Sequence, residues 1–295
     1  NEDGYTSINA SLLSSHLITN VKAMDSIKGT SFDVGDYVYV VNEDGTVAVL
    51  NTMRNEEIQG WTHWVTDGLV EDVAVLNKEV YFVVLREGER FIELLTENTY
   101  TDHNVEIDGI EPTTANVIRL TDNVVRLTDN VIHTDLTTGT AITEIVTDYD
   151  AVFANTLFKV VADFSIMPDA LYEGTGGSNK FTITRDAYRL EVGLNFTTKV
   201  TTLPIATTTK KGNTLHRRKR VVKVDINVLN SLGIYARNRF SGDRMFTVVL
   251  DKAPVAFTGF KEMYLLGYQR LAEIEISQNE PLPFILRGLS YEIEY

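Results

Sequence analysis

Short runs of alternating or continuously apolar residues, rich in Val, Ile, Thr, Tyr and Phe, follow one another along the chain. Gly, Asn and Asp separate these runs, and long amphipathic patterns of helical period are nearly absent. A period of two is typical of strands, and Gly, Asn and Asp supply the conformations of tight turns. The pattern therefore predicts an all-β protein.

The clearest predicted hairpin covers residues 37–50. Residues 37–41 and 46–50 are strand-like, and Asp44 and Gly45 between them supply the positive φ values that a tight turn needs. Strand, turn and strand recur at short spacing from residue 60 to residue 95. This spacing is typical of propeller blades, whose sheets need neighbours to bury their faces.

We therefore predict a partial β-propeller over residues 1–104. About two blades are visible, so a closed ring requires residues upstream of Asn1 or from another subunit. One helix is predicted at residues 7–17, where Ser7 or Asn9 can cap and the apolar residues share a face. We expect this helix to pack on the edge of a blade.

Residues 105–175 contain a near-perfect seven-residue repeat, which starts at Arg119 and again at Arg126. Its Thr-Asp-Asn triplets disfavour helix, so we predict a β insertion of short strands with Asp-Asn turns. Residues 172–179, rich in Gly and Ser, are the predicted linker. Residues 176–295 alternate again, which predicts a C-terminal antiparallel module, either a β-sandwich or a barrel.

The composition narrows the classes of function. The chain has 295 residues, 43% of them hydrophobic, and no Cys. Disulfides, thiolate metal sites and thiol nucleophiles are thereby excluded, and the five scattered His give a zinc site little support. No apolar run is long enough to span a membrane. We predict no catalytic residues, no cofactor, no metal and no membrane insertion.

The first residue is not Met, so either a leader has been removed or the chain is part of a longer one. We favour the second interpretation and expect these residues to be a C-terminal part.

The formal charge of -14 is unevenly distributed. Residues 1–207 carry 13 Lys and Arg against 32 Asp and Glu, whereas residues 208–295 carry 14 against 9. Duplex DNA binds clustered Lys and Arg, so most of this surface would repel it. The sharpest basic feature is a run containing Lys210, Lys211, Arg217, Arg218, Lys219 and Arg220. This run is either a solvated loop or a subunit contact, and in the second case an acidic neighbouring subunit is the expected partner.

Other candidate sites have simpler interpretations. Trp61 and Trp64 could stack sugars or bases, but large aromatics beside β turns mostly pack between blades. His63 lacks a Ser or Cys partner at a recognisable spacing. Acidic pairs such as Glu71 and Asp72 could be glycosidase carboxylates only if they faced each other across a cleft, so solvated faces are the default interpretation. Gly174 to Ser178 lack the ending of a phosphate loop.

The order of several motifs resembles the podovirus tail nozzle family, also called tail tubular protein B. The motifs that carry the resemblance are residues 60–68, 73–75, 80–84 and 91–95, followed by residues 192–196, 203–204, 218–224 and 282–286. The resemblance covers residues 1–104 and 180–295. Residues 105–175 differ from the usual family segment, and the N-terminal half of such proteins is absent.

The resemblance implies a structural subunit of a ring, hexameric in the family, at the distal end of a phage tail in the virion. Its implied partners are other copies of the chain, the adaptor and the tail fibres, and viral DNA passes through without specific binding. An acidic inner wall would not trap DNA. We take Asp122, Asp129 and Asp135, at predicted turns, as candidate lumen-lining acids. The alternatives are a glycan-binding or depolymerising virion tail protein and an unrelated cellular propeller protein.

Overall fold

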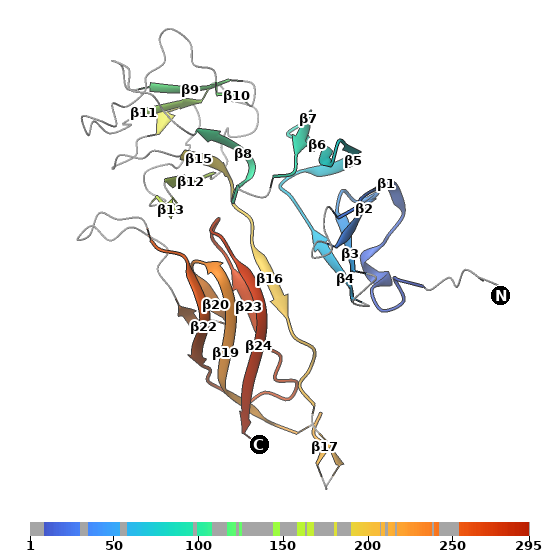
Figure 1. The fold of residues 1–295 in the computed structure, drawn as a ribbon, viewed down its shortest axis with the longest axis vertical. Helices are drawn as coiled ribbons and strands as arrows, with labels where there is room; N and C mark the ends of the chain where they lie inside the picture. Colours follow the sequence, from blue (N-terminus) through green and yellow to red (C-terminus); the bar gives the residue numbers. More distant parts are fainter. Residues whose placement is uncertain are drawn as a thin grey trace, which may run out of the picture. The chain divides into compact units, whose positions relative to one another are not determined.

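The computed structural model describes residues 9–29, 35–53, 58–96, 99–107, 117–121, 124–125, 144–147, 158–162, 164–167, 180–181, 190–206, 208–209, 212–215, 217–237, 239–241 and 254–294. The described residues form sheets with almost no helix, which confirms the all-β prediction. Their strand pairs are antiparallel except for residues 117–120 and 144–147, which pair in parallel. The chain divides into two compact units, residues 1–98 and 99–295. The colours of Figure 1 follow the sequence from blue at the N-terminus to red at the C-terminus. The domain boundaries expected from the sequence stay predictions.

The first unit contains two antiparallel meanders (Figure 1). The sheet with the strand order β1-β2-β3-β4 consists of β1 (Val21–Ile27), β2 (Asp36–Asn42), β3 (Val47–Met53) and β4 (Ile58–Trp64). The sheet β5-β6-β7 consists of β5 (Leu69–Leu76), β6 (Glu79–Arg86) and β7 (Glu89–Leu94). Strands β2 and β3 confirm the hairpin predicted at residues 37–50, because Val41 lies opposite Val47.

The turns of these meanders follow the expected chemistry with one correction. Of the predicted pair Asp44 and Gly45, only Gly45 has a positive φ, 81°. The backbone N–H of Asn42 bonds Thr46 O at 2.9 Å, so the loop has three residues, and such a loop needs the left-handed conformation only at its last position. Asn77 and Lys78, with φ of 51° and 71°, form a two-residue turn between β5 and β6.

The two meanders share one hydrophobic core. It contains Tyr39, Val41, Val47, Val49, Val70, Val73, Val80, Phe82 and Val84. Side chains that alternate along each strand meet in this core because successive side chains point to opposite faces. Two hydrogen bonds also tie β5 to the first sheet: Val70 N donates to Gly45 O at 3.0 Å, and Val75 N donates to Asp25 Oδ2 at 2.7 Å.

The helix predicted at residues 7–17 is wrong for the described residues 9–17. Only Ser15–Leu17 form a single 3-10 turn, and the residues before them are turns. The side chain of Asn9 accepts hydrogen bonds from Ser11 N at 3.1 Å and from Ser11 Oγ at 3.0 Å. Such local bonds compete with helix formation. The expected apolar face is not buried either, since Leu13 is 91% exposed.

The C-terminal part of the second unit contains two sheets that share a core. One has the order β16-β23-β20-β21, formed by β16 (Thr198–Thr201), β23 (Glu275–Gln278), β20 (Ile234–Ala236) and β21 (Arg239–Ser241). The other has the order β22-β19-β24, formed by β22 (Phe257–Tyr264), β19 (Arg220–Ser231) and β24 (Ile285–Glu294). Val224, Ile226, Ile274 and Ile276 belong to the common core. The described strands form open sheets and no closed barrel, so the barrel alternative is wrong.

The predicted β insertion contains strands in two further sheets. One has the order β13-β12-β15-β8, formed by β13 (Ser165–Ile166), β12 (Phe158–Ala162), β15 (Leu190–Leu194) and β8 (Asp102–Ile107). The other has the order β10-β9-β11-β14, formed by β10 (Val124–Val125), β9 (Val117–Thr121), β11 (Glu144–Thr147) and β14 (Lys180–Phe181). A short pair, β17 (Thr208–Thr209) and β18 (Gly212–Asn213), completes the strands.

The seven-residue repeat is described only in part. In its first copy Thr121 pairs with Val124, so the strands on either side of the expected Asp-Asn turn are antiparallel. The turn residues themselves, the second copy at residues 126–132 and the predicted linker at residues 172–179 lie outside the described residues.

Candidate subunit-contact surfaces

The structure separates the members of the predicted basic run. Lys219 is fully buried, and its Nζ donates to the carbonyl oxygens of Thr214 at 3.0 Å and Leu215 at 3.3 Å. Its ammonium group therefore holds the chain segment that precedes β19. Arg220 is half-buried and lies 3.9 Å from the carboxylate of Glu294.

Arg217 and Arg218 are the exposed members of the run. The other two members named in the prediction, Lys210 and Lys211, lie outside the described residues, as do the candidate lumen acids Asp122, Asp129 and Asp135.

The exposed cations of the run lie beside a second exposed segment. Lys219 and Gln269 form an antiparallel bridge, with N–H to O distances of 2.9 and 2.8 Å. Arg218 and Arg270 each come directly beside a bridged residue in sequence, and Arg270 is also exposed. Apolar side chains flank these cations: Tyr268 is 52% exposed and Leu271 is 47% exposed.

We call this surface the basic tip and define it by Arg217, Arg218, Tyr268, Arg270 and Leu271. Sequence reasoning found Arg217 and Arg218 but missed Arg270. That residue is 52 positions further along and is brought close only by the Lys219–Gln269 bridge.

Three turns of the first unit meet at one end of its sheets. The β2–β3 turn contacts the start of β5, where Val70 N donates to Gly45 O. The β4–β5 connection contacts the end of β6, where the guanidinium group of Arg86 donates to Asp67 O. All three turns expose carboxylates, and we define the acidic end by Glu43, Asp44, Asp67, Glu87 and Glu89.

One carboxylate of the acidic end is held in place by its own turn. Asp44 Oδ1 accepts hydrogen bonds from Thr46 Oγ1 at 2.7 Å and Thr46 N at 3.0 Å. These bonds lower the pKa of Asp44, because they favour the ionised carboxylate.

A buried ion pair supports the same end. Arg86 is 2% exposed, and its guanidinium group donates to both carboxylate oxygens of Glu93, at 2.7 and 2.9 Å. A bidentate arrangement of this kind is strong and directional. The positive charge of Arg86 is therefore neutralised by Glu93 inside the unit. It does not neutralise the exposed carboxylates of the acidic end.

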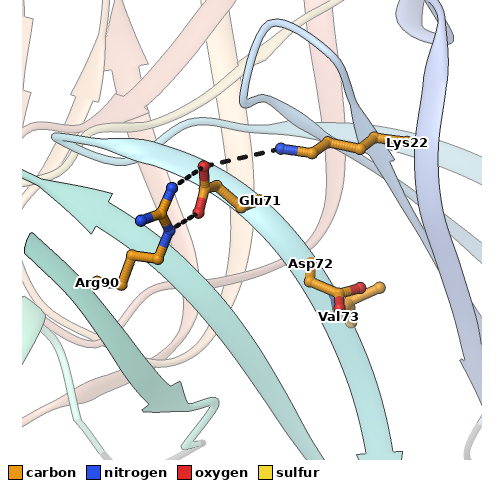
Figure 2. A network of polar contacts seen from close by, with 5 residues as sticks. All are labelled: Lys22, Glu71, Asp72, Val73 and Arg90. Atoms are coloured by element: carbon orange, nitrogen blue, oxygen red, sulfur yellow. Dashed lines mark hydrogen bonds and ion pairs between the residues drawn. The ribbon is translucent and has the colours of Figure 1, made fainter.

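A second polar network joins three strands of the first unit (Figure 2). Glu71 on β5 accepts hydrogen bonds from Arg90 on β7 at 2.5 and 3.3 Å, and the ammonium group of Lys22 on β1 lies 3.9 Å from it. The hydrogen bond from Arg90 holds the pKa of Glu71 below its usual value. Asp72, also drawn in Figure 2, accepts a hydrogen bond from Val73 N at 2.8 Å. Both carboxylates have partners within the unit, in agreement with their structural interpretation.

The outer face of the sheet β5-β6-β7 exposes apolar side chains beside the charged residues Asp72 and Arg90. Ile92 lies opposite Val83 and is 76% exposed, and Leu94 lies opposite Tyr81 and is 44% exposed. We call this surface the open face and define it by Tyr81, Val83, Ile92 and Leu94. Exposed apolar patches mark sites that contact other proteins.

The aromatic residues flagged in the sequence make contacts within the first unit. The indole N–H of Trp61 donates to Ala10 O at 2.8 Å. The ring of Trp64 lies 5.8 Å from that of Tyr39, a core residue. His63, between the two Trp, is exposed on β4. These contacts tie both indoles to the first unit, although Trp64 is still 36% exposed.

The outer face of the sheet β22-β19-β24 carries a network that sequence reasoning missed. Lys223 Nζ lies 2.5 Å from Glu262 and 3.3 Å from Asp225. The hydrogen bond to Glu262 raises the pKa of Lys223 and lowers that of Glu262. The available signal was strand alternation, which places Lys223 and Asp225 on one face, but their partner on β22 depends on the strand register.

Within the described ranges, no group of three or more His, Cys, Asp or Glu could hold a metal ion. Among the same residues no helix is long and apolar enough to cross a membrane. A scan of the sequence against protein-family models gives no match. A search of curated proteins also gives no match.

Proposed function

We propose that this protein is a non-enzymatic structural subunit of a bacteriophage tail nozzle, part of the conduit through which the viral genome leaves the virion. The observation that carries the proposal is the pair of successive meanders with a common core, the second of which keeps an open face. The N-terminal motifs that resemble the nozzle family lie in and between β4, β5, β6 and β7 of these meanders.

The meanders suit two neighbouring blades of a propeller. In a propeller each blade is an antiparallel meander that packs face to face against the next. Strand β5 packs against β1 and β2, and Asp25 of β1 accepts a hydrogen bond from Val75 of β5 at 2.7 Å. The open face then takes a further blade, supplied by another copy of the chain. The two sheets that share the C-terminal core form the sandwich module of the same subunit.

The charge of the protein suits a channel for DNA. Each Lys or Arg that contacts a phosphate releases counterions and holds the duplex. A chain with a net charge of -14 offers few such contacts, so DNA slides past it. Both indoles considered for sugar stacking are engaged within the first unit, so we do not advance glycan binding as a second function.

Mass photometry and cryo-EM of the purified protein test this proposal. We expect closed rings of several copies, and we expect Ile92→Glu on the open face to shift the population to smaller species. A charge placed in an apolar contact costs several kcal/mol unless it is paired. Leu13→Glu is the matched control, because Leu13 is 91% exposed and lies outside the open face.

Circular dichroism checks that both variants keep their β structure. A wild-type protein that is monomeric at every concentration would refute the ring. A cryo-EM map with a basic inner wall would refute the acidic conduit.

A further inference from the structure

We propose that the basic tip of one copy binds the acidic end of a second copy. The inference rests on the proposed function, because it adds a second contact, besides the open face, between subunits of the ring. It goes further in assigning the two complementary surfaces by residue.

Among the described residues of the second unit, the basic tip has no compensating charge. Arg218 and Arg270 are exposed cations that come directly beside the Lys219–Gln269 bridge in sequence, and Arg217 is a third exposed cation next to them. The ion pairs of the described residues in this unit involve other cations, such as Arg220 and Lys223. An anionic partner would offset these positive charges.

The composition of the basic tip is that of a protein interface. Arg and Tyr are enriched at the centres of interfaces, where they supply most of the binding energy. Tyr268 and Leu271 are both about half exposed and lie next to the cations. A purely electrostatic site for DNA phosphates would not need these apolar neighbours.

The acidic end offers the complementary charge. The first unit, residues 1–98, carries 6 Lys and Arg against 17 Asp and Glu. Five of these carboxylates project from three adjacent turns, and the guanidinium group of Arg86 at the same end is buried against Glu93. Complementary potentials of this kind fix the register of an interface and accelerate association.

Two different surfaces that bind each other form a heterologous contact. Such a contact repeats from copy to copy and closes a ring when the rotation between copies permits. The arrangement thus explains why one chain carries a basic patch on an otherwise acidic surface. It also predicts that assembly weakens with salt, because exposed charge pairs are screened within about 8 Å at 0.15 M ionic strength.

A charge-swap experiment on the full chain tests the contact by sedimentation velocity and mass photometry. We expect Arg217→Glu/Arg218→Glu to weaken self-association by at least about tenfold, in line with the loss of close interfacial charge pairs. Glu87→Lys/Glu89→Lys is expected to weaken it similarly. A mixture of the two variants is expected to associate again, because the reversed charges are complementary. Arg287→Glu, an exposed cation on β24, is the matched control and is expected to leave association unchanged.

The outcomes separate the contact from the proposed function. Rings that survive both charge reversals would overturn the contact and leave the nozzle proposal intact. Dimers or open chains that the reversals abolish and the mixture restores would support the contact and contradict a closed ring. A wild-type monomer at every concentration would overturn both. Retention of a DNA duplex that depends on Arg217 and Arg218 would assign the basic tip to nucleic acid and overturn the contact between copies.

Discussion

Single residues in this protein are used in ways that their type alone does not reveal. Lys219 belongs to a run of basic residues, yet its side chain is buried and donates to two backbone carbonyls. Arg86 is buried in the same way and depends on Glu93. Transferring a cation from water to the protein interior costs free energy. A buried cation is therefore stable only where hydrogen bonds or an opposite charge compensate that cost. Lys219 and Arg86 therefore stabilise local structure, and only exposed residues near them can contact other molecules.

The first prediction concerns the Arg86–Glu93 pair. We expect Glu93→Ala to lower the free energy of unfolding of the first unit by about 3 kcal/mol, because it leaves a buried guanidinium group without its carboxylate. Urea unfolding followed by Trp fluorescence measures this loss, since both Trp residues lie in the first unit. Glu89→Ala is the control, because Glu89 is an exposed acid of the same strand. Equal effects of the two substitutions would contradict the role given to the pair.

At the scale of elements, turn chemistry and close approaches determine how the strands pair. The left-handed residues Asn77 and Lys78 make a two-residue turn that fixes the register of β5 and β6. In the second unit β8 and β15 approach closely at Gly193. A Cβ atom there would lie 2.6 Å from Thr101 Oγ1 and 2.7 Å from the backbone oxygen of Asp102. The register shift between these strands falls at the same point.

The second prediction follows from this approach. Gly193→Ala is expected to destabilise the second unit by about 1–3 kcal/mol, the usual cost of forcing an extra carbon into packed surroundings. Gly288→Ala is the matched control, because Gly288 also lies in a strand and a Cβ there meets nothing within 4 Å. Differential scanning calorimetry measures both variants. A loss for Gly288→Ala as large as that for Gly193→Ala would show that steric overlap is not the cause.

At the scale of the whole molecule, the protein has two compact units with separate cores. The core built on Tyr39 and Phe82 belongs to the first unit, and the core built on Val224 and Ile274 belongs to the second. Units with separate cores unfold separately unless a large interface couples them.

The third prediction is therefore a thermal unfolding profile with two transitions. We expect Glu93→Ala to lower the midpoint of one transition and Gly193→Ala to lower that of the other, because the two residues belong to different units. Calorimetry of the wild-type protein and the two variants decides this. A single transition that both substitutions shift equally would contradict independent unfolding.

Local sequence determined the strands and turns of this protein. Alternating apolar residues and Asn or Gly at turns fix a strand and its neighbour along the chain, as for β2 and β3, since the period of two and the turn geometry are both local properties. The helix expected at residues 7–17 does not form over the described residues, where the side chain of Asn9 accepts hydrogen bonds from Ser11. The hydrophobic pattern does not show that such local bonds compete with helical backbone bonds.

Tertiary structure decided which charges are buried and which distant residues meet. Only the fold buries Lys219, leaves Arg217 and Arg218 exposed, and bridges Lys219 to Gln269, the neighbour of Arg270. Likewise, the three acidic turns gather at one end only because two meanders pack on a common core. Contacts between residues far apart in sequence depend on the packing of whole sheets, and no local pattern encodes that packing.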